Sequence, residues 1–310
     1  MAESSANPLV YYSYPGLMTD PGEHAALLKG LPAEIPALCR VVQTNLLHIF
    51  WAAGYGVELS DERKQEVQIR RISTQLAYIA RTDNRLLTVP RPPEKRLVGN
   101  CRDFTLMLTT LLRHQGIPAR ARCGFGAYFT PGKYEDHWVC EYWNADQGRW
   151  VLVDAQLDEL QVKTLGVTFD PCDVPRDQFL VGGQAWQLCR TGQINPDDCG
   201  IFDLHGLWFV RGDMIRDLAA LNNMELLPWD SWGIIDEFDD QKPSDEAMAL
   251  LDHIAALTTP GSNEVFPEIR GLYESDTRLK VPAVIRSYID GPTPHSINIM
   301  DVEALPESVQ

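Results

Sequence analysis

The hydrophobic positions that follow residue 101 recur at the spacing of an α-helix. They form one apolar stripe made of Phe104, Met107, Leu108, Leu111 and Leu112. Gly116 is placed as a C-terminal cap, and Pro118 follows it, where a helix cannot continue. Cys101 therefore lies at or near the N-terminus of the predicted helix, and Gly99 allows a tight turn into it. Unpaired backbone N–H groups and the helix dipole favour an anion there, which makes a thiolate easier to form.

Beyond this helix the pattern changes to alternation, which is typical of a strand. Residues 118–129 place small and aromatic apolar side chains on one face, with Arg120 and Arg122 on the other. Gly124 and Gly126 weaken this strand signal, because glycine has no side chain to pack. A turn-rich break then separates the strand from the next apolar run.

Two further apolar runs, residues 136–143 and 150–154, flank a turn and predict a β-hairpin. The expected register sets His137 directly opposite Asp154. A shift of two residues keeps both side chains on one face as diagonal neighbours, whereas an odd shift separates them. The hairpin thus predicts an imidazole and a carboxylate within hydrogen-bond reach, beside the helix that begins with Cys101.

Helical spacing predicts most of the remaining elements. The expected helices cover residues 34–53, 60–80, 182–190, 209–221, 244–257 and 266–273. Ser60 and Ser244 are the expected N-caps of two of them. Residues 81–96, rich in arginine and proline, form a linker that either walls the cleft or is a solvated connection. The chain from Gly291 onward is expected to be extended or frayed.

Cys101, His137 and Asp154 stand on three separate elements, which is the arrangement that thiol acyl transfer needs. An imidazole takes the thiol proton, and a carboxylate orients the imidazole and stabilises its charged form. Each residue alone is more often structural: a single cysteine is usually a small buried residue, and a single histidine or aspartate usually satisfies local hydrogen bonds. Their joint placement favours the catalytic interpretation.

Four separated motifs in this part of the chain resemble the core of the transglutaminase-like superfamily. They span residues 99–104, 112–120, 136–143 and 149–154. The resemblance covers roughly residues 61–160 and implies a papain-like α+β fold. It also implies a thioester intermediate, with Cys101 as nucleophile, His137 as base and Asp154 as the residue that orients the base.

The fold class expected from this resemblance is α+β, with the helix that carries Cys101 packed on an antiparallel sheet. Residues 1–60 are expected to form an N-terminal helical layer, and residues 61–240 the transglutaminase-like catalytic core. Residues 241–310 are expected to form a C-terminal extension that covers one side of this core.

The superfamily includes transamidases, peptidases, amidases and peptide N-glycanases, as well as inactive scaffolds. Animal transglutaminases typically have a tryptophan directly after the cysteine, whereas this chain has Arg102, in the manner of the bacterial branch. We therefore expect attack by Cys101 on an amide or peptide carbonyl, with the acyl group released mostly to water. The alternatives are acyl transfer to an amine, including a biosynthetic condensation, and a catalytically silent binding scaffold. The expected partner is a peptide, a protein or a small-molecule amide.

Three further residues are candidates for contacts with substrate. The backbone N–H of Cys101 is expected to donate to the oxyanion, and Asn100 is a candidate for the second donor. Trp138 directly follows the candidate base and would shield it from water. Trp186 would line an acyl pocket, although aromatic residues in such regions more often serve packing.

Composition and charge narrow the class of partner. The chain has 310 residues and a formal net charge of −16, which disfavours nonspecific binding to nucleic acid or to an anionic membrane. Its seven cysteines include no C-x-x-C pair, and no histidine has zinc-ligand spacing. We therefore expect a reducing compartment and no structural metal.

Other sequence signals are missing. No glycine loop has the spacing of a phosphate-binding site, so no cofactor is expected. No secretory signal and no apolar run long enough to span a bilayer is visible, so a cytoplasmic location is expected. The sequence leaves the oligomeric state open.

Overall fold

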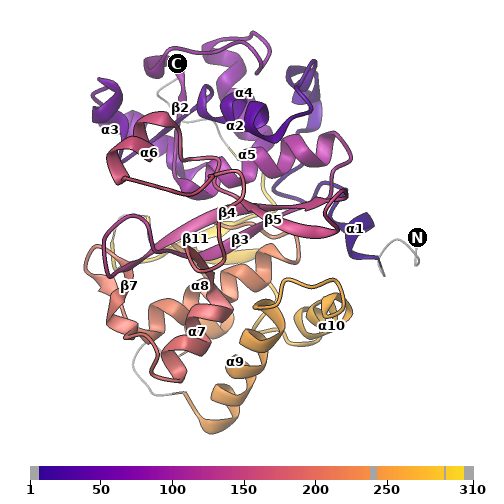
Figure 1. Ribbon diagram of the computed structural model, residues 1–310, viewed down its shortest axis with the longest axis vertical. Helices are drawn as coiled ribbons and strands as arrows, with labels where there is room; N and C mark the ends of the chain where they lie inside the picture. The colour runs from indigo at the N-terminus through magenta and orange to yellow at the C-terminus, as the bar shows by residue number, and fades with distance from the viewer. Residues whose placement is uncertain (1–6, 238–242, 290, 304–310) are drawn as a thin grey trace. The chain divides into compact units, whose positions relative to one another are not determined.

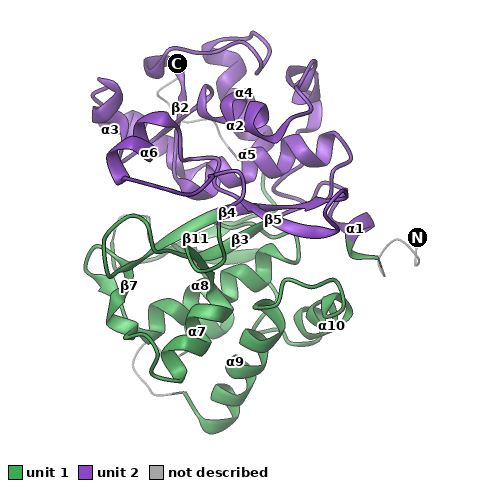
Figure 2. Cartoon of the chain, in the orientation of Figure 1, with its two compact units in different colours: residues 1–8, 121–138, 175–301 green, residues 9–120, 139–174, 302–310 purple. Residues whose placement is uncertain are grey.

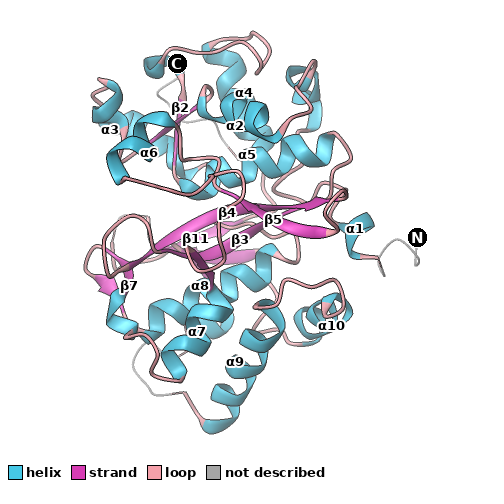
Figure 3. Cartoon of the chain, viewed as in Figure 1, coloured by secondary structure: helices cyan, strands magenta, loops and turns pink. Residues whose placement is uncertain are grey.

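The computed structural model describes residues 7–237, 243–289 and 291–303. Helices and strands are mixed along the chain (Figure 3), which confirms the α+β class. Two compact units are interleaved in the sequence (Figure 2). Unit 1 comprises residues 1–8, 121–138 and 175–301, and unit 2 comprises residues 9–120, 139–174 and 302–310. The division into three segments at residues 60 and 240 stays a prediction.

The central element of unit 2 is helix α5, Cys101–His114 (Figure 1). It packs against α2, Ile35–Gln43, and α4, Ile72–Thr82. It also contacts the short parallel pair formed by β1, Leu46–His48, and β2, Leu97–Gly99. Every residue of α5 from its first to its thirteenth position is buried, so the helix has no solvent-facing side.

The other helical segments of unit 2 are short. They are η1 Gly22–Leu28, η2 Ala52–Tyr55, α3 Asp61–Lys64, η3 Gln65–Gln68, η4 Pro93–Lys95 and α6 Glu159–Leu165, together with α1 Pro8–Tyr11, whose first residue belongs to unit 1. The linker that contains η4 is irregular, as expected, but Arg91 within it is buried. The Arg91 guanidinium donates to Asn45 Oδ1 at 2.5 Å and to the carbonyl of Asp83 at 2.7 Å. The linker is therefore anchored to its own unit by a buried cation.

In unit 1, α8, Leu207–Ala220, packs against α7, Gly182–Arg190 (Figure 1). The helix α9, Asp245–Thr258, packs on both α7 and α8. The helix α10, Phe266–Ser275, contacts α8 and α9. The helices expected near residues 182, 209, 244 and 266 are thus confirmed, and the Ser244 hydroxyl caps α9 by accepting from the N–H of Ala247.

The largest sheet has six strands in the order β6-β3-β4-β7-β8, with β5 paired to β4. Its strands are β3 Ala119–Gly126, β4 Tyr134–Asn144, β5 Arg149–Val153, β6 Phe179–Val181, β7 Cys199–Ile201 and β8 Leu204–His205. The pairs β3–β6, β4–β5 and β7–β8 are antiparallel, whereas β4 and β7 run parallel. A short 3₁₀ turn, η5 Pro196–Asp198, precedes β7.

A second, smaller sheet lies in unit 1 and is antiparallel throughout. It joins β9 Asp230–Ser231, β10 Val284–Ser287 and β11 His295–Asn298, and the 3₁₀ turn η6 Gly233–Ile235 follows β9. Of the chain after Gly291, expected to be extended or frayed, His295–Asn298 is extended and pairs as β11 with β10, and residues 304–310 lie outside the described residues. Among the residues that the structure describes, no helix combines the length and apolarity needed to cross a bilayer.

Two of the expected helices are shorter than their apolar patterns suggest. The helix expected over residues 34–53 ends at Gln43, and the chain continues as β1. Consecutive buried residues in β1 extend the apolar run, and apolar spacing alone does not separate a buried strand from a buried helix. The helix expected over residues 60–80 begins at the Ser60 cap, as predicted, but stops at Lys64.

The break after Lys64 has a local cause. Glu66 turns inward, is 1% exposed, and its carboxylate accepts from the backbone N–H of Val98 at 2.7 Å and from Arg63 Nε at 3.0 Å. A buried carboxylate is stable only when such donors satisfy it. The chain therefore passes through η3 to bring Glu66 to β2, and the next helix, α4, begins only at Ile72.

Packing within unit 1 explains why glycine stands at positions 124 and 126, where it weakens the strand pattern. A Cβ atom at Gly124 would lie 2.1 Å from the carbonyl oxygen of Leu180 on β6. A Cβ atom at Gly126 would lie 2.7 Å from the ring of Phe129. Both glycines thus mark places where another group approaches the backbone closely, and the strand forms despite them.

Candidate active site

Cys101 is the first residue of α5, as the sequence predicts, and is 8% exposed. The side-chain oxygen of Asn100, the N-cap, accepts from the N–H of Arg102 at 3.0 Å. In return, Asp103 Oδ2 accepts from the N–H of Asn100 at 2.9 Å, which completes a capping box. The first turn that carries the sulfur is therefore held from both sides, and its N-terminal dipole favours a negative charge.

A buried polar network lies under this turn. Asp103 Oδ1 accepts from Gln75 Nε2 at 2.8 Å and from Arg102 Nη1 at 3.0 Å. Burial raises the pKa of the Asp103 carboxyl, and the charge of Arg102 opposes this shift. Arg102 also donates to the carbonyl of Arg70 at 2.6 Å and is fully buried. Arg102 therefore supports the helix start from below, and its guanidinium does not face solvent.

Gly99 leaves room for this network of hydrogen bonds. A Cβ atom at Gly99 would lie 3.0 Å from both Cβ and Oδ2 of Asp103. The glycine ends β2 and leaves room for the carboxylate that closes the capping box. Its role is close approach of the backbone to Asp103.

His137 lies in β4 within unit 1 and is 2% exposed. Three aromatic rings surround its imidazole in edge-on geometry. The ring centroids of Phe129, Tyr128 and Phe179 lie 4.8, 5.9 and 6.3 Å from that of His137. An imidazole held among aromatic edges has a fixed ring plane, which is what a positioned proton carrier needs.

Asp154 directly follows β5 within unit 2 and is 1% exposed. Its Oδ1 accepts from the N–H of Gln156 at 3.0 Å, and its own N–H donates to the carbonyl of Pro171 at 2.8 Å. Asp154 also lines a cavity of about 200 Å³ together with Cys39, Arg40 and Cys172. The residue is thus fixed at its backbone and stands at the wall of a cavity.

The register of the hairpin differs from the expected one by two residues. Cys140 pairs with Val153, so Asp154 continues the ladder opposite Val139, where His137 was expected. The reason is the turn: the last pair is Asn144 with Arg149, and the loop inside it is centred later than the sequence pattern suggests. The shift is even, so the alternation of faces along β4 is the one predicted.

The structure divides the three candidate catalytic residues between the compact units. Cys101 and Asp154 belong to unit 2, and His137 belongs to unit 1. Strand β4 passes from one unit to the other directly after Trp138. That the three residues form one site is therefore a proposal.

The three candidate substrate contacts differ in their surroundings. Asn100 is 5% exposed, and its Nδ2 has no hydrogen-bond partner among the described residues. Trp138 is fully buried and follows His137 on the opposite face of the strand. Trp186 is 1% exposed, and its indole N–H donates to Asp252 Oδ1 at 2.7 Å, which joins α7 to α9. Packing accounts for Trp186, whereas Asn100 Nδ2 and Trp138 Nε1 are both buried donors without a partner among the described residues.

Sequence reasoning missed the buried charge pairs of β3 and β4. Arg120 Nε donates to Glu141 Oε2 at 2.7 Å, and its guanidinium stacks 4.0 Å from the ring of Trp150. Arg122 donates to both carboxylate oxygens of Asp217 at 2.9 Å. The available signal was the presence of two arginines in an alternating strand, where such residues are depleted unless paired.

Comparison with known proteins gives two matches. Residues 57–155 match the family model of the transglutaminase-like superfamily. A solved structure from Cytophaga hutchinsonii, named "Putative Cysteine Protease", is 16% identical with a TM-score of 0.33; the match covers 56% of this chain and 45% of that one. This chain therefore spans less than half of that protein. No curated protein matches the chain significantly. The family match supports cysteine-based enzymatic chemistry at the level of the superfamily.

Proposed function

On the premise that residues 57–155 form a transglutaminase-like core, we propose that the chain is a cysteine-nucleophile acyl-transfer enzyme. In this proposal Cys101 attacks an amide or peptide carbonyl, and the acyl group passes mostly to water. The observation that carries the proposal is the position of Cys101 as the first residue of a long, buried helix whose N-terminus is closed by a capping box. A helix start of this kind stabilises the thiolate that the attack needs.

The proposed roles follow from the chemistry of the three side chains. The His137 imidazole takes the thiol proton, and the Cys101 sulfur then forms a bond to the carbonyl carbon. The C–N bond breaks as the imidazolium returns its proton to the leaving amine, which leaves a thioester on the sulfur. Water attacks the thioester with His137 again as base, and the acid product leaves as the thiol re-forms. Asp154 orients the imidazole and stabilises its charged form.

The oxyanion of each tetrahedral intermediate needs two donors. The N–H of Cys101, at the N-terminus of α5, is the first. The unused Nδ2 of Asn100 supports this residue as the second, because the cap hydrogen bond occupies the amide oxygen and leaves the NH₂ group without a partner among the described residues. A buried donor without a partner is costly, so a transient partner such as an oxyanion gives it a function.

We expect the Asn100→Ser variant to separate the two roles of this residue. Serine is an equally good N-cap, so the free energy of unfolding should change by less than about 0.5 kcal/mol. The lost donor should lower kcat by about 10²- to 10³-fold with little change in KM. The measurement is steady-state hydrolysis of an activated ester, with circular dichroism as the check on folding. An unchanged kcat would place the second donor elsewhere.

Water and amines compete for the same thioester, and we propose that water prevails. Transfer to an amine requires that the site excludes water and positions the amine. The Arg102 side chain is buried in the core. The residue after the nucleophile therefore does not cover the Cys101 sulfur, and it does not expose that sulfur to solvent either. The net charge of −16 favours the approach of cationic amines, and this observation keeps the transamidase reaction as the second candidate.

The partition of products between acid and amide tests this assignment. With p-nitrophenyl acetate as acyl donor and cadaverine as amine, we expect free acetate to dominate up to roughly millimolar amine, the scale of ordinary enzyme–substrate affinity. The Cys101→Ala variant, run in parallel, corrects for direct aminolysis of the ester in solution. Dominant amide at that amine concentration would replace the hydrolase assignment with the transamidase one.

A further inference from the structure

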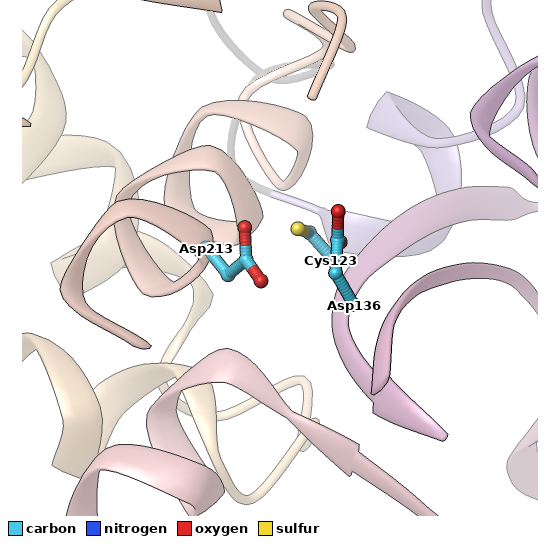
Figure 4. Close-up of side chains that lie close together, drawn as sticks. All are labelled: Cys123, Asp136 and Asp213. Atoms are coloured by element: carbon cyan, nitrogen blue, oxygen red, sulfur yellow. The ribbon is translucent and has the colours of Figure 1, made fainter. Parts of the chain in front are cut away.

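A cluster of three potential metal ligands lies within unit 1, and one of them, Asp136, directly precedes His137 in the sequence. Cys123 on β3, Asp136 on β4 and Asp213 on α8 each offer one ligand atom, and these atoms all lie within 4.8 Å of one another. Figure 4 shows the Cys123 sulfur and the Asp213 carboxylate directed toward each other across the space between helix and strands. The three residues come from elements that are far apart in the sequence, so packing of the fold creates the cluster.

Two oxygen atoms of the cluster, Asp136 Oδ1 and Asp213 Oδ2, are buried and have no hydrogen-bond partner among the N–H and hydroxyl donors of the described residues. Within the cluster, the Asp213 carboxyl interacts with the Asp136 carboxyl and with the Cys123 thiol. Asp213 is fully buried, and Asp136 is 9% exposed. Native proteins rarely leave buried carboxylate oxygens unsatisfied, so such atoms point to a group that is bound there.

The charges of the cluster favour a cation. Burial raises the pKa of Asp136 to about 6, and burial together with the charge of Asp136 raises that of Asp213 well above its ordinary value. Burial raises the pKa of the Cys123 thiol as well. Arg216, whose Nη1 lies 3.1 Å from Asp213 Oδ1, neutralises one carboxylate. The raised pKa values mean that these groups tend to hold their protons while no cation is present. A divalent cation that displaced the protons would, together with Arg216, balance the negative charges of the two carboxylates and the thiolate.

We propose that Cys123, Asp136 and Asp213 bind a divalent transition-metal cation of the zinc class. One thiolate and two carboxylates are a donor set that suits Zn²⁺, whereas Mg²⁺ and Ca²⁺ prefer oxygen ligands alone. The separation of the donor atoms fits three ligands around one ion, with a water as the fourth. Binding releases the thiol proton and the proton held by the carboxyls, and it ties β3 and β4 to α8 within unit 1.

Cobalt(II) absorption tests the site, because a thiolate bound to Co²⁺ gives a charge-transfer band in the near ultraviolet. The full-length, reduced Cys101→Ala chain is treated with a chelator and titrated with Co²⁺, so that the candidate nucleophile does not compete as a ligand. We expect one Co²⁺ per chain, displaced by Zn²⁺ and not by Mg²⁺. We expect the band to vanish in the additional Cys123→Ser variant and to persist in Cys189→Ser.

The Cys189→Ser variant is the matched control, since Cys189 and Cys199 form another pair of neighbouring sulfurs in unit 1, 4.0 Å apart. A band that is lost in this variant and kept in Cys123→Ser overturns the proposal, as does the absence of any band at millimolar Co²⁺. In the latter case Asp136 and Asp213 share a proton in place of a metal. If Cys123→Ser does not fold, Asp136→Asn keeps the thiol and should weaken Co²⁺ binding at least about tenfold; unchanged affinity overturns the proposal.

Discussion

Replacing Cys101 with alanine should abolish acyl transfer while the fold persists. We expect hydrolysis of p-nitrophenyl acetate to fall by at least about 10³-fold, because the reaction loses its nucleophile and no other group replaces it. The capping box of α5 uses only the side chains of Asn100 and Asp103, so it survives the change. The free energy of unfolding should therefore change by no more than about 1 kcal/mol. Initial rates at equal protein concentration measure the effect.

The matched control for this variant is Cys140→Ala. Cys140 is fully buried in β4, and burial raises its pKa to about 12, so it is a thiol of the same fold without the features of a nucleophile. We expect this control to lose some stability, as core truncations do, and to keep its rate when folded. Residual turnover in Cys101→Ala close to that of the wild type would show that the sulfur of Cys101 is not the nucleophile.

Among the substitutions considered for this chain, removal of the Asp217 carboxylate should cause the largest fall in the free energy of unfolding. Asp217 is fully buried and accepts from Nε and Nη2 of Arg122 at 2.9 Å and from the N–H of Cys123 at 3.0 Å. In Asp217→Ala the Arg122 charge stays in the core without its counter-ion. We expect the free energy of unfolding to fall by about 3–5 kcal/mol, the cost of a buried, uncompensated charge. Chemical denaturation followed by circular dichroism measures it.

The chain offers an exposed counterpart of this ion pair. Arg149 and Asp173 also form a bidentate pair, but their side chains are 45% and 46% exposed. Solvent screening reduces the value of such a pair, so Asp173→Ala should lower the free energy of unfolding by no more than about 1 kcal/mol. Equal effects of the Asp217 and Asp173 substitutions would contradict the assignment of Arg122 and Asp217 as a buried pair that stabilises unit 1.

The start of α5 could be predicted from the sequence because its determinants are local. The apolar stripe, the C-terminal glycine and the position of Cys101 all lie within twenty residues of one another. The structure confirms Cys101 as the first residue of α5, whereas the C-cap is Gln115, with Gly116 directly after it in the left-handed region, and α5 is buried on all sides. The N-terminal capping box is also a local feature of the sequence, because Asn100 and Asp103 are three positions apart. Hairpin parity was predictable for the same reason, although the turn is centred later and moves the register by two residues.

The remaining features depend on contacts between distant residues, which a single sequence does not reveal. Nothing near Arg122 indicates Asp217, a partner ninety-five positions away. Glu66 shortens a helix because it reaches Val98, thirty-two positions away. The cluster of Cys123, Asp136 and Asp213 likewise forms only when β3, β4 and α8 pack together. Buried pairs of this kind override local periodicity, because their desolvation must be compensated in the folded state.

The order of thiol reactivity bears directly on the central claim, and the structure identifies the competing thiols. Cys172 and Cys189 are both half-buried. A hydrogen bond from Cys39 lowers the pKa of Cys172, and one from Cys199 lowers that of Cys189. Neither Cys172 nor Cys189 is the first residue of a helix, and no imidazole is proposed as the partner of either. Loss of the imidazole should therefore affect Cys101 and leave Cys172 and Cys189 unchanged.

The rate of alkylation at each cysteine, mapped by peptide mass spectrometry in the wild type and in His137→Gln, tests the proposed thiolate–imidazolium pair. Glutamine retains a polar side chain of similar size without a group that titrates. In the wild type we expect Cys101 to react fastest with iodoacetamide at about pH 6, where an ordinary thiol is protonated. In His137→Gln the Cys101 rate should fall at least about tenfold at that pH, with Cys172 and Cys189 unaffected. Equal Cys101 rates in the two proteins would contradict the account.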